Sequence, residues 1–268
     1  FINEKELGKK EFELFNLLDL GDIIGISGNV FRTKASEITI SVKKLELLTK
    51  SLRPLPDKWH GLKDIEERYR KRYVDLIVNP EVKEIFIKKF KIVNSIRETL
   101  NKHDYIEVDT PIMQPVYGGA NAKPFKTYVN DLKRDAYLRI SDELYLKRLI
   151  VGGFDKVYEL NKDFRNESID STHNPEFSMI EFYQAYADYH DMMKLTEEII
   201  SNTVKAIGNK NEVNFMGNKI NLKTPFKVMT VKEAIKKFGN IDVNKLNDKG
   251  LFKLKEKYKL EHRGILTR

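Results

Sequence analysis

The chain has 268 residues and carries 48 Lys and Arg against 40 Asp and Glu, a formal charge of +8. This length fits one large domain or two smaller ones, at roughly 100–200 residues per domain. The sequence has no cysteine, which excludes disulfide scaffolds, cysteine-ligated metals and thiol catalysis and fits a cytoplasmic protein. No apolar run reaches the roughly 18 residues of a membrane span, so no membrane partner is expected. The basic excess permits nucleic acid binding without predicting it.

Residues 12–50 are predicted to be β structure. Short apolar runs at Ile23–Ile26 and Val30–Phe31 flank a predicted turn at Ser27–Asn29. Residues 38–42 then alternate between apolar and polar, as one half-buried strand does. Small antiparallel barrels have this pattern. The prolines that follow, at 54 and 56, predict a linker.

A long helix is predicted from Pro80, because apolar residues from Phe86 to Leu100 recur at spacings of three and four. Further along the chain, capping and turn signals place Thr230 at a helix start and Gly239 just past its end. The other expected elements are strands at 105–108, 154–160 and 177–186, a helix at 190–206, and a hairpin at 213–222 turning at Gly217-Asn218. Strands interleaved with helices without a regular βαβ rhythm predict an α+β fold with an antiparallel sheet.

Residues 164–183 combine charged and aromatic side chains in a strand pattern. Two extended segments, Phe164–Glu167 and His173–Tyr183, flank a polar turn. Because side chains two apart on a strand share a face, Arg165 and Glu167 are predicted to point the same way. On the second strand one face is predicted to carry Phe177, Met179, Glu181 and Tyr183, and the other Ser178, Ile180 and Phe182.

Two interpretations of this predicted face remain open. A solvated face with an exposed Arg–Glu pair would contribute less than ~1 kcal/mol, and such pairs are common. A ligand pocket instead combines apolar walls with a few convergent polar groups, and the alternation of rings with acids favours it. Arginine suits phosphate, an aromatic ring can stack on a base, and Glu181 with Tyr183 can hold an ammonium group.

Two further features are ambiguous by themselves. Glu143 is either part of that cation site or an ordinary acid at a helix N-terminus. Gly118-Gly119 either approaches a ligand closely or forms a plain flexible loop. The sequence has no P-loop or dinucleotide-binding glycine pattern. The five histidines lack metal-ligand spacing, so no metal site is predicted within this chain.

These strings resemble the lysyl-tRNA synthetase family of class II aminoacyl-tRNA synthetases. Phe164–Glu167 followed by His173–Phe177 is similar to motif 2 of class II synthetases, and the helix and strand over 86–111 resemble motif 1, their dimer-forming element. Strings similar to lysyl-tRNA synthetases in particular occupy 48–56, 72–77, 145–149, 172–177 and 181–189. The bacterial or organellar form is the most similar.

The resemblance implies a lysine–tRNA ligase that uses ATP and Mg²⁺ to make lysyl-adenylate and then transfers the lysyl group to tRNA(Lys), as a homodimer formed through 86–111. By the family's pattern, Arg165 would act in catalysis by contacting the α-phosphate and the lysine carboxylate. The adenosine end would be held by Glu167, His173 and Asn174, with Phe177 under adenine. Lysine would be recognised by Gly119, Glu143, Glu181 and Tyr183.

The resemblance also implies boundaries and departures. Residues 1–52 would be the C-terminal part of an OB-fold anticodon-binding domain, 53–64 a linker, and 65–268 a class II catalytic domain cut before motif 3. We expect an internal piece of a longer protein, inactive alone, with the magnesium ligands in the missing part. Ser141-Asp142 replaces a usual Ala-Pro, and Asn161–Asp163 and Ser168 replace residues that are often Gly-Arg-Asn and Gly.

Two rival functions remain open at this point. A synthetase paralogue that lysylates a protein shares the fold, but such paralogues generally lack the OB-like segment expected before Arg53. A non-catalytic tRNA-binding or regulatory module built from synthetase parts is the second rival. The presence or absence of a Gly-rich, Arg-containing motif downstream of Arg268 would discriminate between an enzyme and such a module.

Overall fold

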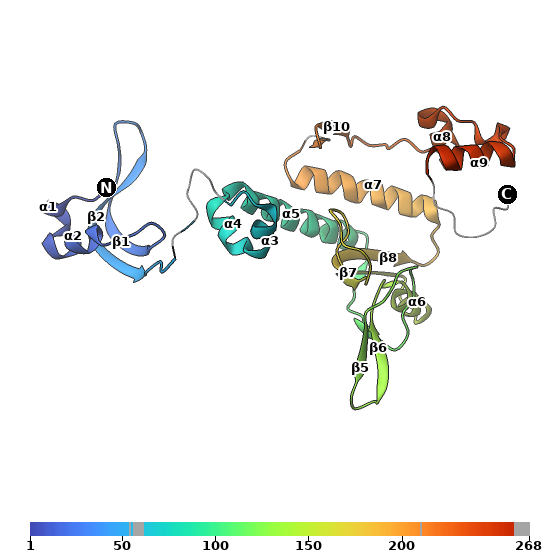
Figure 1. Cartoon of the computed structure of the whole chain (residues 1–268), viewed down its shortest axis with the longest axis horizontal. Helices are drawn as coiled ribbons and strands as arrows, with labels where there is room; N and C mark the ends of the chain where they lie inside the picture. The colour runs from blue at the N-terminus through green and yellow to red at the C-terminus, as the bar shows by residue number, and fades with distance from the viewer. Residues whose placement is uncertain (54, 56–61, 210, 260–268) are drawn as a thin grey trace. The chain divides into compact units, whose positions relative to one another are not determined.

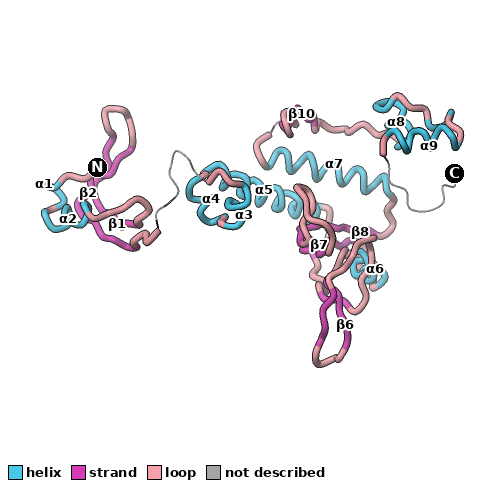
Figure 2. Tube along the Cα trace, viewed as in Figure 1, coloured by secondary structure: helices cyan, strands magenta, loops and turns pink. Residues whose placement is uncertain are grey.

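A computed structural model describes residues 1–53, 55, 62–209 and 211–259 (Figure 1). The chain forms two compact units, Phe1–Phe90 and Lys91–Arg268, whose boundary falls inside helix α5 (Pro80–Lys102). Helices and strands interleave along the chain (Figure 2). Most strand pairs are antiparallel, which confirms the predicted α+β class.

The first unit contains an antiparallel hairpin of β1 (Ile23–Arg32) and β2 (Ile38–Thr49). The turn predicted at Ser27–Asn29 is wrong, because β1 runs straight through it with only a register shift between Ser27 and Gly28. A Cβ on Gly28 would lie 1.9 Å from the Ser41 carbonyl oxygen. This glycine therefore allows two strands to approach closely at a bulge.

Two short helices, α1 (Glu4–Leu7) and α2 (Lys9–Asn16), precede this hairpin. The β prediction is therefore wrong for residues 12–16. Phe12 and Leu14 of α2 pack against a small core of Leu7, Val42 and Leu45. The expected linker falls mostly outside the described residues, which lack 54 and 56–61.

The first unit continues with α3 (Ile65–Arg70) and α4 (Arg72–Val78). Asp75 is completely buried and accepts hydrogen bonds from Arg68, Arg72 and Asn79. Burial of this carboxylate is tolerated because it is fully paired. Arg68 and Arg72 of this charge-rich segment are therefore anchored to a buried carboxylate.

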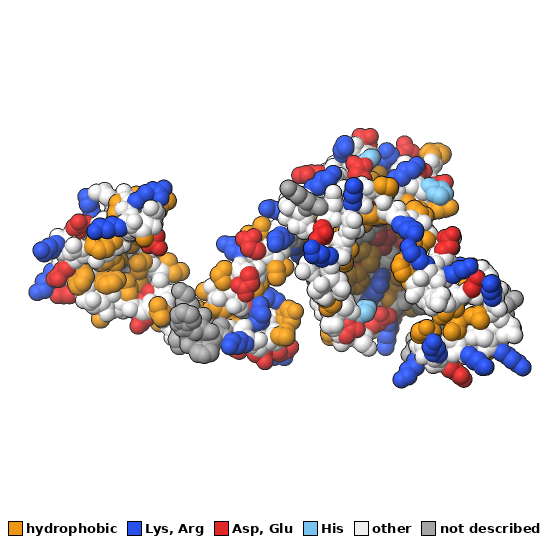
Figure 3. All heavy atoms as spheres, turned by 90° about the horizontal axis from the view of Figure 1, so that it is seen from above, with side chains coloured by type: hydrophobic (Ala, Val, Ile, Leu, Met, Phe, Trp, Pro, Cys, Tyr) orange, Lys and Arg blue, Asp and Glu red, His pale blue; other side chains and the backbone are white. Residues whose placement is uncertain are grey.

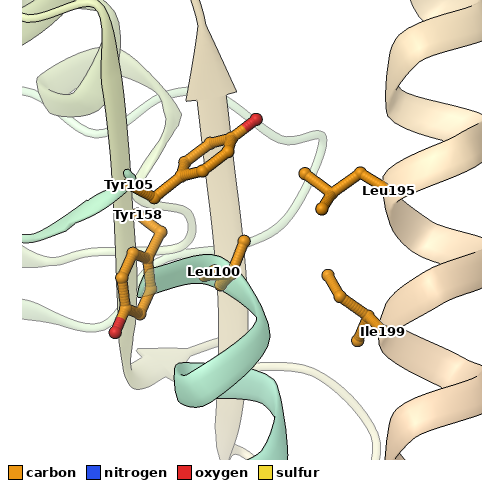
Figure 4. Packing of buried hydrophobic residues seen from close by; sticks show 5 residues of the cluster. All are labelled: Leu100, Tyr105, Tyr158, Leu195 and Ile199. Carbon is orange, nitrogen blue, oxygen red and sulfur yellow. The ribbon is translucent and has the colours of Figure 1, made fainter. Parts of the chain in front are cut away.

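The core of the second unit lies between a sheet and two helices. Leu100 of α5 and Leu195 and Ile199 of α7 (Tyr189–Ala206) meet Tyr105 and Tyr158 (Figure 4). The apolar stripe predicted for α5 is confirmed at Leu100, which is 0% exposed. Burying each of these side chains contributes about 1.5–3 kcal/mol.

The second unit contains two three-stranded sheets, of which the first contributes to this core. The first has the order β3-β7-β8, with β7 and β8 antiparallel and β3 parallel to β7, and the second has the order β4-β6-β5. Helix α6 (Glu143–Val151) connects β6 to β7 and contacts both β7 and β8. The strands are β3 (Ile106–Glu107), β4 (Met113–Gln114), β5 (Lys126–Val129), β6 (Arg134–Leu138), β7 (Lys156–Phe164) and β8 (Glu176–Gln184).

The C-terminal part contains the predicted hairpin, β9 (Glu212–Phe215) and β10 (Asn218–Asn221). It turns at 216–217, one residue earlier than predicted. Helix α8 (Val231–Gly239) has the predicted capping box, but Gly239 is its last residue and Asn240 adopts the left-handed conformation. A short 3₁₀ turn (Val243–Lys245) and α9 (Asp248–Lys257) follow.

Charge is distributed over the surface with both signs. In Figure 3 the Lys and Arg side chains on the visible face are interspersed with acidic ones and do not form a single patch. Within the described ranges, no helix has the length and apolarity needed to cross a membrane.

Candidate active site

The β7–β8 hairpin has two chemically different faces. Its register pairs Glu159 with Glu181, Asn161 with Met179, and Asp163 with Phe177. Residues paired across antiparallel strands share a face, so these six side chains and Tyr183 form what we call the polar face. Tyr158, Ile180 and Phe182 lie on the opposite, core face and join the hydrophobic cluster. The predicted division of residues 177–183 between two faces is confirmed.

Arg165 follows directly after β7 and extends the polar face. Its amide donates to the Pro175 carbonyl at 2.8 Å, which continues the hairpin pairing by one residue. Its guanidinium lies 5.1 Å from the centre of the Phe177 ring. Nε and Nη2 each donate to the Ile140 carbonyl at 3.3 Å. A half-buried arginine is thereby held beside an aromatic ring.

Glu167 does not continue the strand. Its amide donates to the Arg165 carbonyl at 2.9 Å, so the chain turns at Asn166. Its carboxylate accepts from the Lys123 amide at 3.2 Å instead of lying with the other acids. The prediction that Arg165 and Glu167 point the same way by strand alternation is therefore wrong, because β7 ends at Phe164.

His173 and Asn174 lie in the exposed loop between β7 and β8. The His173 ring Nδ1 is 2.8 Å from the Asp170 carboxylate. Backbone and side-chain donors of Thr172 and His173 lower the pKa of Asp170 well below its usual range. This carboxylate therefore organises the loop that precedes β8.

Glu181 is the hub of the polar face. Its carboxylate accepts from Ser141 Oγ at 2.6 Å, from the Asp142 amide at 3.3 Å and from the Tyr183 hydroxyl at 3.0 Å. Burial and the neighbouring charge of Glu181 raise the pKa of Tyr183, so its phenol remains a donor. Three donors therefore converge on the Glu181 carboxylate.

Glu143 stands at the first position of α6, beside this hub. Lys147 Nζ donates to its carboxylate at 2.7 Å and lies 5.9 Å from the Tyr183 ring centre. Gly119 packs against the same helix start, with φ at +86°. A Cβ there would lie 2.8 Å from Ser141 Oγ and 2.9 Å from Glu143 Cβ, so only glycine fits this approach.

Arg139, at the end of β6, was missed by the sequence analysis. Its side chain is completely buried. Nε donates to the Lys162 carbonyl at 2.9 Å, and Nη1 donates to Glu159 at 2.5 Å. Glu159 also accepts from the Thr110 amide and hydroxyl, at 3.2 and 2.6 Å. Arg139 therefore joins three chain segments beneath the polar face.

Two aspartates next to Arg139 are completely buried. Asp142 Oδ1 lies 3.0 Å and Asp163 Oδ1 3.2 Å from Arg139 nitrogens, yet none of their four carboxylate oxygens has a hydrogen-bond partner. Burial, followed by repulsion from Asp163, raises the pKa of Asp142 to about 8. Burial raises the pKa of Asp163 to about 6, against the attraction of Arg139.

Oxygens of Asp142, Asp163 and Glu181 all lie within 4.8 Å of one another. They do not fit Mg²⁺, which keeps several water ligands, because both aspartates are 0% exposed and Arg139 already adjoins them. No magnesium site is therefore assigned to the described part of the chain. The polar face instead offers acids for an ammonium group, an arginine for an anion, and an aromatic ring for a planar base.

Similarity to known proteins agrees with this site, in which an arginine follows one strand of an antiparallel sheet and an aromatic ring lies opposite it. The family model described as tRNA synthetases class II (D, K and N) matches residues 64–263. The chain therefore belongs to the class II tRNA synthetases of this group.

Curated relatives point to one member of the group. The chain is 53% identical over 248 residues to a lysine–tRNA ligase of Carboxydothermus hydrogenoformans, covering 92% of this chain and 51% of that protein. It is 54% identical over 243 residues to lysine–tRNA ligase 2 of Methanosarcina acetivorans, covering 90% and 48%. The chain spans about half the length of the curated relatives it matches.

Proposed function

We propose that the protein containing this chain is a lysine–tRNA ligase. The observation that carries this proposal is the hydrogen-bonded hub at Glu181, where Ser141 and Tyr183 donate to a carboxylate on the same face of β8 as Phe177, the ring that Arg165 contacts. Acids next to an arginine and a ring suit an amino acid with a distal ammonium group and a nucleotide. The function for which these relatives are named supports the same assignment.

The proposed reaction joins the lysine carboxylate to the α-phosphate of ATP and releases pyrophosphate. Attack of a carboxylate oxygen on phosphorus needs no protein nucleophile, and positioning with charge stabilisation lowers the barrier. Arg165 neutralises charge on the α-phosphate and the lysine carboxylate. Phe177, which already carries the Arg165 guanidinium at 5.1 Å, stacks on adenine.

Lysine is recognised by acids in this proposal. Glu181 and Tyr183 bind an ammonium group, Glu143 binds a second one, and the Gly119 backbone closes over the substrate. A site built to pair both ammonium groups rejects analogues that lack one, because its acids would be left unpaired. Glu167, His173 and Asn174 line the adenosine end. Mg²⁺, which supplies charge neutralisation for phosphates, would be held outside the acid cluster at Asp142.

The first 52 residues are proposed to be part of an OB-fold that binds the tRNA anticodon, followed by a linker at 53–64 and the catalytic domain from 65. The long hairpin and its exposed apolar side chains support this, with Val30 69% and Ile38 70% exposed. The net charge of +8 suits a tRNA partner.

A homodimer through 86–111 is supported by the exposure of Phe90 and Ile106. The absence of cysteine fits a cytoplasmic enzyme.

Amino-acid-dependent ATP–pyrophosphate exchange tests this function. The product of the complete open reading frame that encodes this chain is assayed with lysine, aspartate and asparagine, the three substrates of the family group. Exchange with lysine alone is the expected result. Exchange with another of the three, or with none, would overturn the proposal. Lysylation of tRNA in preference to protein then distinguishes the ligase from a protein-modifying paralogue.

A further inference from the structure

The polar face has more buried acids than its cations can balance. Glu159 is fully used, because Arg139, Asn161 and both donors of Thr110 bind its carboxylate. Arg139 also lies 3.0 Å from Asp142 and 3.2 Å from Asp163, so one guanidinium faces three buried acids. A fourth acid, Glu181, joins the group, because oxygens of Asp142, Asp163 and Glu181 lie within 4.8 Å of one another.

Of these three acids, only Glu181 has hydrogen-bond donors for its carboxylate oxygens. It accepts from Ser141, Tyr183 and the Asp142 amide. Asp142 and Asp163 accept no hydrogen bond on any oxygen, although both are 0% exposed. Arg139 Nη1 lies 3.0 Å from Asp142 and Nε 3.2 Å from Asp163, but they donate their hydrogen bonds to Glu159 and to the Lys162 carbonyl, and Nη2 has no hydrogen-bond partner. Ionised carboxylates without donors in a buried site are costly, so a proton or another cation must accompany them.

We propose that Asp142 and Asp163 hold one proton between them in the empty pocket and release it when lysine binds beside Glu181. This inference rests on the proposed lysine site and extends it. The released proton makes the pocket one unit more negative when a substrate with two ammonium groups arrives. The pair therefore contributes to the preference for a dibasic amino acid without contacting it.

The groups that face the pair support release over uptake. They are Arg139, Glu143, Glu159, Arg165, Glu181 and Tyr183. The acids among them keep the proton on the pair in the empty pocket, consistent with the raised pKa of Asp142, about 8, and of Asp163, about 6. A substrate ammonium at Glu181 adds positive charge nearby and favours loss of that proton. The substrate carboxylate pairs with Arg165 in the proposed site and does not offset this effect at the pair.

Calorimetry of lysine binding at pH 7 measures this directly. The complete protein is titrated with lysine in buffers of different ionisation enthalpy, because the observed heat changes with the buffer in proportion to the protons released. About one proton per bound lysine is expected. Asp142→Asn and Asp163→Asn, which keep the shape of the side chains, are each expected to bring this number close to zero.

Asp131→Asn is the matched control, since Asp131 is an exposed aspartate of the β5–β6 loop. It should release as many protons as the wild-type protein. Lysine binding without proton release in the wild-type protein would overturn the inference and leave the proposed function intact. Proton release that persists in both the Asp142→Asn and the Asp163→Asn variant would also overturn the inference and leave the proposed function intact. If lysine does not bind at all, the proposed function and this inference both fail. The wild-type result decides even if a variant does not fold.

Discussion

The two faces of the β7–β8 hairpin are equally buried at their centre and chemically opposite. Tyr158 and Glu159 are neighbours in β7 and are 0% and 1% exposed. Tyr158 packs among leucine, isoleucine and tyrosine, whereas Glu159 lies in a network with Arg139 and Thr110. Burial alone therefore does not identify a hydrophobic core. The partners of each side chain distinguish the face that stabilises the fold from the face proposed to bind the substrate.

The imbalance of the polar face is the more informative difference. On the core face apolar side chains pack against one another, and the Tyr158 hydroxyl donates a hydrogen bond to Glu107 at 2.9 Å. On the polar face, carboxylates of Asp142 and Asp163 lack donors. A protein retains such an arrangement at a stability cost when the site has a function. The predictions below separate the two faces by changing one at a time.

The largest effect on stability is expected from the core face. Leu100→Ala removes a completely buried side chain from the cluster with Tyr105 and Leu195, and should lower the free energy of unfolding by about 2–5 kcal/mol. Urea unfolding of the chain measures this. Leu132→Ala, at a position that is 58% exposed, is the control and should change stability little. Equal effects of the two substitutions would contradict the assignment of this core.

The largest effect on activity is expected at Arg165. Arg165→Ala removes the cation proposed for the α-phosphate, and should slow lysine-dependent ATP–pyrophosphate exchange by about 100-fold to 1,000-fold. The unfolding midpoint should stay nearly unchanged, because Arg165 donates only to one carbonyl, that of Ile140. Arg134→Ala on an exposed strand end is the control. Near-normal exchange in the Arg165 variant would refute the role proposed for this residue.

A smaller, pH-dependent effect is expected at Asp142. Burial raises the pKa of Asp142 from 3.8 to about 8 in the folded protein, so the folded protein binds this proton more tightly than the unfolded chain does. The stabilisation is complete below about pH 4 and is lost as the pH rises through about 8. Asp142→Asn removes this dependence and should be more stable than wild type at pH 9 by about 1–3 kcal/mol.

Urea unfolding at pH 5 and pH 9 measures this difference. The two proteins should have similar stability at pH 5, where the wild-type aspartate is protonated. A wild-type protein that gains stability relative to Asp142→Asn as the pH rises would contradict the sign worked out here.

The smallest effect is expected at Tyr183. Tyr183→Phe removes the hydroxyl that donates to Glu181 at 3.0 Å and leaves the ring in place. Lysine affinity should fall by about 1 kcal/mol, or roughly fivefold, because Glu181 retains its other two donors. Calorimetric titration with lysine provides the measurement. An unchanged affinity would remove Tyr183 from the proposed site.

Much of this hairpin could be predicted from the sequence. A period of two places Ile180 and Phe182 opposite Glu181 and Tyr183, and the structure confirms that division. The helix from Pro80 was predictable from another regular pattern, because its apolar residues recur at spacings of three and four. Local errors occurred where a different backbone conformation fits the same residues. Ser27–Asn29 resembles a turn, but Gly28 forms a bulge within β1.

The balance of charge beneath the polar face was not predicted. Arg139, Asp142 and Glu159 come from β6, the start of α6 and β7, and their contact depends on how these elements pack. One signal was present in the sequence, because Glu159 and Asp163 of β7 and Arg165, which directly follows β7, are separated by even numbers of residues. Reading this alternation together with Arg139 would have indicated a buried charged network.

Paired measurements on adjacent residues of β8 test the separation of the two faces most directly. Ile180→Ala alters the core face and Glu181→Gln the polar face of one strand. Urea unfolding and lysine affinity are measured for both variants of the complete protein. We predict that Ile180→Ala loses stability and retains lysine affinity, whereas Glu181→Gln loses at least about tenfold in affinity and retains stability. Two variants that shift both quantities in parallel would contradict the separation of the faces.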